Sequence, residues 1–549
     1  MKKQILALLA VIIVLAVFSA KACIAYQQTF LTVKSSGFVQ QATPPPPLGK
    51  YSYIMSVSGS NYHMIDGATG QLVFQSASSS QVFSNVVGNC SVGSSVYVES
   101  GLYVVNTMWT MLDVNNVTLN FEAGAQLIAG NGLDTSVLMI GEPYYPSNNI
   151  TVNGITINGN AANQVITYSN SWNEGEVVQY PNGLGVSGSN DKIIDAKITN
   201  CRVMGVSFFW TASGGQFTYE TNDGITNSQI YNCGWNGITF YGSPVSTNFY
   251  LTDSTIWGCS DVGVSLTGGV NISVSGNYVY DMSGTTGSEN SEVAIAIEGG
   301  GDDTITNNTI YDSCIGISNS GWSNNLIANN TISVSSSYYV SYGSGGSLSS
   351  NNPVIYHETW GIVSSGCNDL ISDNTVTGML ANATSGYYNT GGDGLWLAGE
   401  KSSYISNNTI SQCQGYAVYA NSGQGVSIGN ILTENTIFDD IYGIYDNNVP
   451  ENTFIANTGY NPVGSISNPI SGGTTYLVDS GSNSVWTSGM TYTNSGSPKT
   501  LDITGGAVSA VTQNGVTLFT ATDCSVTLQP GDTFSVTFSI EPTINVIGD

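Results

Sequence analysis

The chain has 549 residues, of which 41% are hydrophobic and only 9% are charged, so it can bury a large core without many ionic groups. Its 10 basic and 37 acidic residues give a net charge of -27, which excludes nucleic acid as a partner because phosphate contacts depend on lysine and arginine. The same balance disfavours acidic polysaccharides, unless a cation such as Ca²⁺ bridges the carboxylates, and no motif requires Ca²⁺ or any other cofactor.

Residues 1–22 predict an export signal. A basic start, Met1-Lys2-Lys3, precedes an apolar run from Ile5 to Ala20 and a small-residue cleavage pattern at Ala20-Lys21-Ala22. We expect a cleaved signal peptide, with an uncleaved N-terminal membrane anchor as the alternative. A lipoprotein anchor at Cys23 fits less well, because Lys21 interrupts that pattern. In either case the mature protein is expected to be secreted or attached to the cell surface.

Residues 23–50 predict a spacer, since Pro44 to Pro47 favour a semi-rigid extended chain. A large β domain is expected over residues 51–462. It begins with opening strands between Tyr51 and Ser76 and continues with short alternating runs between Val96 and Gln126.

The segments Ser100-Gly101-Leu102-Tyr103, Asn116-Val117-Thr118-Leu119 and Gly124-Ala125-Gln126-Leu127 resemble the first coils of the pectate-lyase-like superfamily. This resemblance implies an all-β fold, a right-handed parallel β-helix, in a family that includes polysaccharide lyases, epimerases and glycoside hydrolases.

A repeated pair of residues supports a solenoid. A small residue followed by an aliphatic one recurs with a period of roughly twenty-two residues, which indicates stacked β coils with an inward aliphatic ladder. The pairs are Gly185-Val186, Gly205-Val206, Gly237-Ile238, Gly263-Val264, Ala294-Ile295, Gly316-Ile317, Gly361-Ile362, Gly394-Leu395, Ala417-Val418 and Gly443-Ile444.

Two further residue types keep the same register. Cys201, Cys233, Cys259 and Cys413 each lie four residues before the small residue, and we expect an interior stack of free thiols rather than disulfides, although export would permit bridges. A recurring asparagine predicts a ladder of stacked amides in a turn. Its members are Asn277, Asn308, Asn330, Asn374, Asn408 and Asn435.

Three coils contain extra residues, at Asp281 to Glu292, Ser333 to Glu358 and Gly378 to Gly392. All three insertions fall at the same point of the repeat, so they should emerge along one edge of the solenoid, where repeat proteins usually bind their ligands. The resemblance implies the same place, because loops beside the first sheet wall the substrate cleft in the pectate-lyase-like superfamily.

Candidate catalytic residues lie along this edge: His357, Asp393, Asp302, Asp303, Glu298 and Tyr356. Two carboxylates flanking a glycosidic bond could hydrolyse it, and a Tyr356–His357 pair would suit lyase or epimerase chemistry. Asn222-Asp223-Gly224 and Gly301-Asp302-Asp303 partly resemble polygalacturonase-like motifs, but no Gly-His-Gly or Arg-x-Lys follows. For any one of these carboxylates, a turn or surface role is the commoner explanation.

Candidate substrate-binding residues are Trp360, Trp396, Tyr387, Tyr388, Tyr419, Tyr445 and Lys401. The side chain two positions after the small residue should point outward, and there the last three coils carry Trp396, Tyr419 and Tyr445. Flat aromatic faces suit sugar rings, so a polysaccharide or cell-surface glycan is the expected partner.

Residues 474–549 predict a small antiparallel β-sandwich, with strands at Val508 to Val511, Val516 to Phe519, Val526 to Leu528 and Phe534 to Phe538. The whole chain is expected to be a monomer that engages polysaccharide. It is either a carbohydrate-active enzyme (a lyase, epimerase or glycoside hydrolase) or a non-catalytic adhesin or envelope protein that binds glycan.

Overall fold

The computed structural model describes residues 47–142, 144–166, 180–209, 211–213, 216–218, 221–242, 247–282, 292–335, 340–342, 354–356, 359–381, 391–420, 427–438, 442–446, 452–455, 457, 475–476, 491–494, 498–540 and 542–548. Contacts divide the chain into two units, residues 1–50 and 51–549. Within the described ranges, none of the helices combines the length and apolar character needed to cross a membrane. The expected export segment, residues 1–22, lies outside the described residues.

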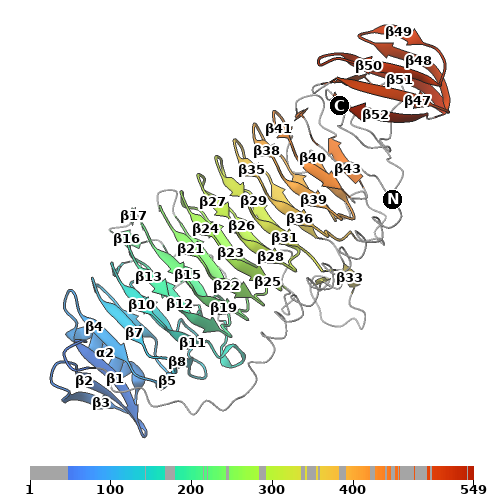
Figure 1. Cartoon of the computed structure of the whole chain (residues 1–549). Helices are drawn as coiled ribbons and strands as arrows, with labels where there is room; N and C mark the ends of the chain where they lie inside the picture. The colour runs from blue at the N-terminus through green and yellow to red at the C-terminus, as the bar shows by residue number, and fades with distance from the viewer. Residues whose placement is uncertain are drawn as a thin grey trace, which may run out of the picture. The chain divides into compact units, whose positions relative to one another are not determined.

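Three long sheets make up the body of residues 51–457. We call them sheets A, B and C in the order in which each coil visits them. Within a sheet, strands from successive coils pair in parallel and lie side by side in chain order, as the colours of Figure 1 show. Parallel crossovers of this kind are right-handed. The chain is therefore a right-handed parallel β-helix, and the predicted fold class is confirmed.

Sheet A contains β1 (Tyr53–Ser58), β2 (Asn61–Asp66), β3 (Leu72–Ser76), β4 (Ser95–Val98), β7 (Thr118–Phe121), β10 (Thr151–Asn153), β13 (Lys192–Ile194), β18 (Gly224–Thr226), β21 (Tyr250–Thr252), β24 (Ser273–Ser275), β27 (Thr304–Thr306), β30 (Leu326–Ala328), β35 (Leu370–Ser372), β38 (Tyr404–Ser406), β41 (Ile431–Thr433) and β44 (Thr453–Ile455). The first three strands pair antiparallel, and all later pairs are parallel.

Sheet B contains β5 (Gly101–Val105), β8 (Ala125–Ala129), β11 (Thr156–Asn158), β14 (Lys197–Thr199), β19 (Gln229–Tyr231), β22 (Thr255–Trp257), β25 (Tyr278–Tyr280), β28 (Thr309–Tyr311), β31 (Thr331–Ser333), β36 (Thr375–Thr377), β39 (Thr409–Ser411) and β42 (Thr436–Phe438).

Sheet C contains β6 (Trp109–Met111), β9 (Leu138–Ile140), β12 (Leu184–Val186), β15 (Val206–Phe208), β20 (Ile238–Tyr241), β23 (Val262–Thr267), β26 (Val293–Ile297), β29 (Ile315–Asn319), β34 (Trp360–Ser364), β37 (Leu395–Leu397), β40 (Tyr416–Ala420) and β43 (Tyr442–Asp446).

The small residue of each coil has a packing reason. A Cβ atom added at Gly205 or Gly316 would come within 2.6 Å of a carbonyl oxygen in the next coil, so a larger residue would push the coils apart. The aliphatic residue that follows is fully buried, as at Val206 and Ile317. One predicted pair is wrong. Gly185 pairs with Ser207 rather than with Gly205, so the small residue of that coil is Gly183.

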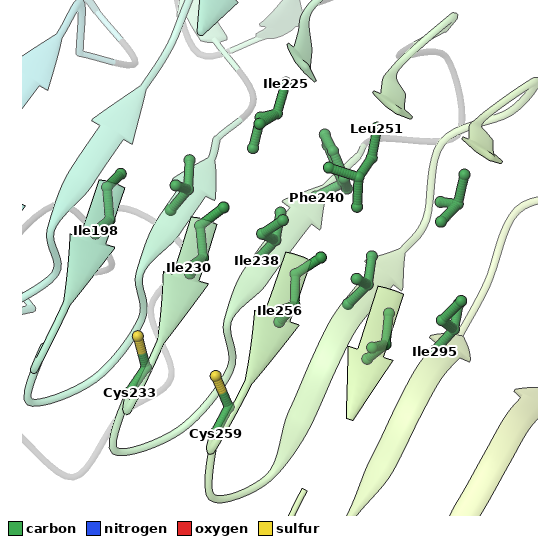
Figure 2. Packing of buried hydrophobic residues seen from close by; sticks show 14 of the residues in the cluster. Ile198, Ile225, Ile230, Cys233, Ile238, Phe240, Leu251, Ile256, Cys259 and Ile295 are labelled. Atoms are coloured by element: carbon green, nitrogen blue, oxygen red, sulfur yellow. The ribbon is translucent and has the colours of Figure 1, made fainter. Parts of the chain in front are cut away.

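The interior ladders agree with the sequence. Figure 2 shows Cys233 and Cys259 projecting in the same direction from adjacent coils, beside the buried isoleucines Ile230 and Ile256. These two thiols, like Cys201 and Cys413, are buried and form no disulfide, as the sequence analysis expected.

The asparagine ladder is also confirmed. The side-chain amide of Asn330 donates to Asn374 Oδ1 at 3.0 Å and to the Ile305 carbonyl at 2.8 Å. Asn308, Asn374 and Asn408 repeat the same bond to the next asparagine. Each turn from sheet A to sheet B is therefore tied to the turn above it.

The three insertions each join a sheet-B strand to a sheet-C strand: β25 to β26, β31 to β34 and β36 to β37. Their predicted emergence along one edge is confirmed. The longest insertion holds no extra coil, since β29 pairs directly with β34; its described part is a hairpin of β32 (Val340–Tyr342) and β33 (Val354–Tyr356). A second hairpin, β16 (Thr211–Ser213) with β17 (Gln216–Thr218), follows sheet C earlier in the chain.

The helix α2 (Ser79–Asn89) was not predicted. It buries Val82, Phe83 and Val86, and the Phe83 ring stacks on Trp109 with centroids 4.2 Å apart. A single 3-10 turn, η1 (Ala161–Asn163), precedes β12.

The last part of the chain forms two mostly antiparallel sheets over a core that includes Leu501, Val511 and Phe534, in keeping with the expected sandwich. Their strands are β45 (Thr475–Tyr476), β46 (Thr491–Thr493), β47 (Lys499–Thr504), β48 (Ala507–Gln513), β49 (Val516–Phe519), β50 (Cys524–Leu528), β51 (Thr533–Ile540) and β52 (Thr543–Gly548).

Candidate functional site

Four aromatic side chains gather on the outer face of sheet C, and we call Trp360, Trp396, Tyr416 and Tyr419 the sheet-C patch. Trp396 lies in register with Val363 of the coil before and with Tyr419 of the coil after. The ring centroids of Trp360 and Trp396 are 5.9 Å apart at an interplanar angle of 31°, and those of Trp396 and Tyr419 are 6.5 Å apart at 42°. Two residues of the predicted aromatic series, Trp396 and Tyr419, are therefore in register, although the Tyr419 side chain is only 8% exposed and Tyr445 is placed by its backbone alone. The patch also includes Tyr416, whose ring stacks on Tyr419 at 5.1 Å and 13° and which the sequence analysis did not single out.

Asp393 lies within this patch. It immediately precedes Gly394, and the hydrogen bonds of its neighbours place its backbone between the coils of Gly361 and Tyr416. Its side chain is 4% exposed and its Oδ1 accepts a 2.7 Å hydrogen bond from the Tyr416 backbone N–H. Burial disfavours the charged form and raises the pKa of Asp393 to about 7. A carboxyl group that gains or loses its proton near neutral pH thus lies in the coil between those of Trp360 and Tyr416.

Glu298 is not brought together with Asp393. It follows the sheet-C strand β26, and its Oε2 accepts hydrogen bonds from Ser265 at 2.7 Å and Thr267 at 2.8 Å. Three coils separate it from Asp393, which at about 4.8 Å a coil is about 14 Å. The paired carboxylates of glycosidases lie about 5–9.5 Å apart.

Asp302 and Asp303 lie in the turn from sheet C to sheet A. Asp302 is exposed, has a left-handed backbone (φ 58°) and accepts a 3.1 Å hydrogen bond from the Asn324 side chain. Asp303 is fully buried, and its Oδ1 accepts from the Ile272 N–H at 2.8 Å. Lys401 is exposed in the equivalent turn of a later coil. These three residues have structural positions in a turn, away from the strands that carry the sheet-C patch.

The remaining candidates are only partly placed. His357, Tyr387 and Tyr388 lie outside the described residues. Tyr356 ends β33, and Tyr445 lies in β43 in register with Tyr419; both are placed by their backbones. Among the residues that the structure describes, no group of three or more histidine, cysteine or acidic side chains is arranged to hold a metal ion.

A second aromatic series, on sheet B, was missed by the sequence analysis. Tyr231 and Trp257 stack with centroids 4.0 Å apart at 3°, and Trp257 and Tyr280 stack at 5.6 Å and 6°. We call these three residues the sheet-B stack. Each is the third residue of its strand, so aligning the strands by their buried middle residue would have revealed it.

Comparison with known proteins gives a family match to part of the chain. Residues 146–346 match the family described as "Periplasmic copper-binding protein (NosD)", which is fewer than half of the residues. No curated protein matches the chain.

Several solved structures are similar in fold. The catalytic domain of a GH87 alpha-1,3-glucanase in complex with tetrasaccharides is 14% identical, with a TM-score of 0.46 over 76% of this chain and 69% of that one. The A-module of the Azotobacter vinelandii mannuronan C-5 epimerase AlgE6 is 13% identical, with a TM-score of 0.36 over 72% and 92%. DFA-IIIase from Arthrobacter chlorophenolicus A6 in complex with GF2 is 12% identical, with a TM-score of 0.42 over 71% and 94%. At these identities the similarity concerns the fold alone.

Proposed function

We propose that this protein is an exported β-helix that binds a neutral polysaccharide along the outer face of sheet C. The observation that carries the proposal is the sheet-C patch, in which the rings of Trp360, Trp396 and Tyr419 follow one another across successive coils. The Trp396 ring is inclined by 31° to Trp360 and by 42° to Tyr419, so the two tryptophans do not cover each other's faces as parallel rings would. Tyr419 is only 8% exposed and stacks on Tyr416 at 13°, so the tryptophans supply the faces for a ligand. An aromatic face of this kind packs against the apolar face of a sugar ring.

The charge distribution supports a neutral ligand. No strand of sheet C contains a lysine or arginine, and the net charge of the whole chain is -27. A polyuronate approaching this face would meet acidic groups and no fixed cation, so its binding would cost electrostatic energy. A neutral glycan requires only stacking surfaces and hydrogen-bonding groups.

An enzyme is the second candidate, and Asp393 is the observation that favours it. With a pKa of about 7, this carboxyl retains its proton over much of the neutral range, as a general acid toward a glycosidic oxygen must. Hydrolysis would need a further base or nucleophile, and Glu298, three coils away, is too distant to serve.

Copper binding, which the name of the matching family suggests, is not part of the proposal. The matched residues 146–346 include no histidine. The thiols of Cys201, Cys233 and Cys259 lie in the core, each donating to the carbonyl two residues earlier. Hydrogen bonds between neighbouring thiols and burial raise the pKa of Cys233 and Cys259, which favours the protonated thiol over the thiolate that copper would need.

The proposal is tested by affinity electrophoresis and calorimetry against neutral and acidic polysaccharides, with and without Ca²⁺. We expect binding to at least one neutral glycan and none to polyuronates without Ca²⁺. Release of reducing ends by the wild type but not by Asp393→Asn would establish the enzyme, whereas binding without products would establish the adhesin. Failure to bind any neutral glycan would refute the proposal.

A further inference from the structure

A second ladder runs through the turn from sheet C to sheet A, in the position immediately before each sheet-A strand. Successive coils place there Ile150, Asp191, Asp223, Phe249, Ile272, Asp303, Asn325, Asp369, Ser403, Asn430 and Asn452. The polar members accept a backbone N–H from the coil before. Asp191 accepts from Ile150 at 2.7 Å, as Asn452 accepts from Asn430 at 3.1 Å. Aspartate and asparagine therefore occupy one structural position.

The asparagines use their second atom as a donor. Asn430 Nδ2 donates to the Glu400 carbonyl at 2.9 Å, and Asn452 Nδ2 donates to the Ser427 carbonyl at 3.0 Å. Both carbonyls lie three residues before the ladder residue of the preceding coil. By the same count, the carbonyl that faces Asp191 is that of Ser147.

The aspartates have an oxygen where the asparagines have this donor. Oδ2 of Asp191, Asp223 and Asp303 is buried, and none of the described residues donates a hydrogen bond to it. A Cβ atom added at Gly188 would lie 1.7 Å from the Ser147 carbonyl oxygen and 2.6 Å from Asp191 Oδ2, so the two oxygens face one small space. Two unprotonated oxygens would repel there, whereas a protonated Oδ2 is a donor like the asparagine amide.

The surroundings contain no cation to stabilise charged forms. Asp191 and Asp223 face each other, and the Tyr250 phenol lies near Asp223. Asp303 faces Asp302 and Asp369. Among the described residues, no lysine, arginine or histidine contributes to the pKa of these groups. Burial is the largest cause of the raised pKa of all three carboxyls, and that of Asp303 reaches about 7.

We propose that Asp191, Asp223 and Asp303 are neutral carboxylic acids that replace asparagine in this ladder, so that the β-helix is most stable in an acidic medium and loosens as the pH rises through neutrality. The direction of this pH dependence follows from the number of protons that the folded and unfolded states bind. An unfolded aspartate releases its proton near pH 3.9, while the folded chain keeps it to higher pH. Between about pH 4 and pH 7 the folded state therefore binds more protons, and its stability falls as pH rises. This inference does not depend on the proposed glycan binding.

Thermal unfolding at pH 4 and pH 8, at one ionic strength, tests the proposal. We expect the wild-type Tm to be about 5 °C or more higher at pH 4. Asp223→Asn should leave the Tm at pH 4 unchanged and raise the Tm at pH 8. Asp253→Asn is the matched control, because it removes one carboxyl from an exposed turn and Asp253 does not contribute to the raised pKa of any of the three ladder carboxyls, so it should not alter the difference between the two pH values.

Three results would overturn the proposal. One is a wild-type Tm that is equal or higher at pH 8. Another is an Asp223→Asn variant that behaves as Asp253→Asn does, since a general relief of acidic repulsion would affect both variants equally. If Asp223→Asn lowers the Tm at both pH values, the position requires an ionised carboxylate and the proposal is likewise wrong.

Hydrogen exchange of the Asp191 amide, which donates to Asp223 Oδ1 at 2.7 Å, provides a second, local measurement. It should quicken between pH 4 and pH 8 beyond the intrinsic pH effect in the wild type, and not in Asp223→Asn.

Discussion

The sheet-B stack and the sheet-C patch are built from the same kinds of residue on the same solenoid, yet their rings are arranged differently. On sheet B the rings of Tyr231, Trp257 and Tyr280 are parallel within 6°, so each covers a face of its neighbour. On sheet C the rings of Trp360, Trp396 and Tyr419 are inclined by 31° and 42°. A parallel stack uses its aromatic faces within the protein, as Tyr416 and Tyr419 also do at 13° on sheet C. The inclined rings of Trp360 and Trp396 leave part of their faces for a ligand.

Their surroundings differ in the same sense. The sheet-B stack has the Lys197 ammonium 5.9 Å from the Tyr231 ring centroid, and its strands carry threonine and glutamine beside the rings. In the sheet-C patch the buried carboxyl of Asp393 accepts a hydrogen bond from the Tyr416 N–H, and two of the three strands, β34 and β37, follow long insertions. Aromatic residues in register are thus not enough to indicate a binding site. The angle between rings and the polar group among them separate a stabilising ladder from a candidate site.

Replacing one tryptophan in each region by alanine should produce the largest effects on glycan binding and on stability. Trp396→Ala should weaken glycan binding about tenfold to a hundredfold, as expected when a central aromatic contact is removed. Trp257→Ala should leave binding unchanged but lower the free energy of unfolding by about 1–3 kcal/mol, because it breaks two stacked pairs. Calorimetry with the glycan identified in the screen and urea unfolding of both variants provide the two measurements.

The comparison fails if the effects are reversed. Weaker glycan binding in Trp257→Ala would place the ligand on sheet B. A loss of stability in Trp396→Ala as large as that in Trp257→Ala would make the sheet-C patch a structural ladder as well. Each variant serves as the matched control for the other, since both remove one half-buried tryptophan from an outer strand face.

Asp393 should give the sheet-C patch a pH response that the sheet-B stack lacks. Its pKa of about 7 lies well above that of an unfolded aspartate, near 3.9, so ionisation should add a charge beside the tryptophans at about pH 7. Tryptophan fluorescence of the wild type should then show a transition near pH 7. Its folded form binds an extra proton between about pH 4 and pH 7, so the contribution of this group to stability is lost as pH rises through that range.

In Asp393→Asn the fluorescence transition should vanish, while Asp302→Asn should retain it. A transition that persists in Asp393→Asn would mean that another group titrates near the tryptophans. We expect Asp393→Asn to disturb the sheet-C patch less than Trp396→Ala does, because the amide keeps the shape of the carboxyl and its oxygen can still accept the hydrogen bond from the Tyr416 N–H.

The repeat made most of the fold predictable from the sequence. The Gly-aliphatic pair, the asparagine ladder and the cysteine register each follow from the close spacing of coils, which imposes the same packing requirement on every coil. The mistaken pair at Gly185 shows the limit of this reasoning. Gly183 and Gly185 are both glycine followed by an aliphatic residue, and only the strand pairing decides which one faces inward.

The candidate site was predictable in part. Trp396, Tyr419 and Asp393 come together because they share neighbouring coils, a relation that the repeat period reveals. The separation of Glu298 from Asp393 depends on how many coils lie between them and on which end of the strand each occupies. The burial of Asp191, Asp223 and Asp303 was hidden, because an aspartate in a turn is usually exposed. Its only sequence signal was that asparagine fills the same position in later coils.

The smallest expected effect concerns the end of the sheet-B stack. Lys197→Gln should lower the free energy of unfolding by about 0.5 kcal/mol, because an exposed ammonium group over an aromatic ring contributes little. This contribution is electrostatic, so the difference between Lys197→Gln and the wild type in urea unfolding should shrink when the ionic strength is raised. The loss in Trp257→Ala comes from ring contact and should not shrink. If both losses proved equally insensitive to salt, Lys197 would act through the packing of its alkyl chain on Tyr231, and the charge would have no part in the sheet-B stack.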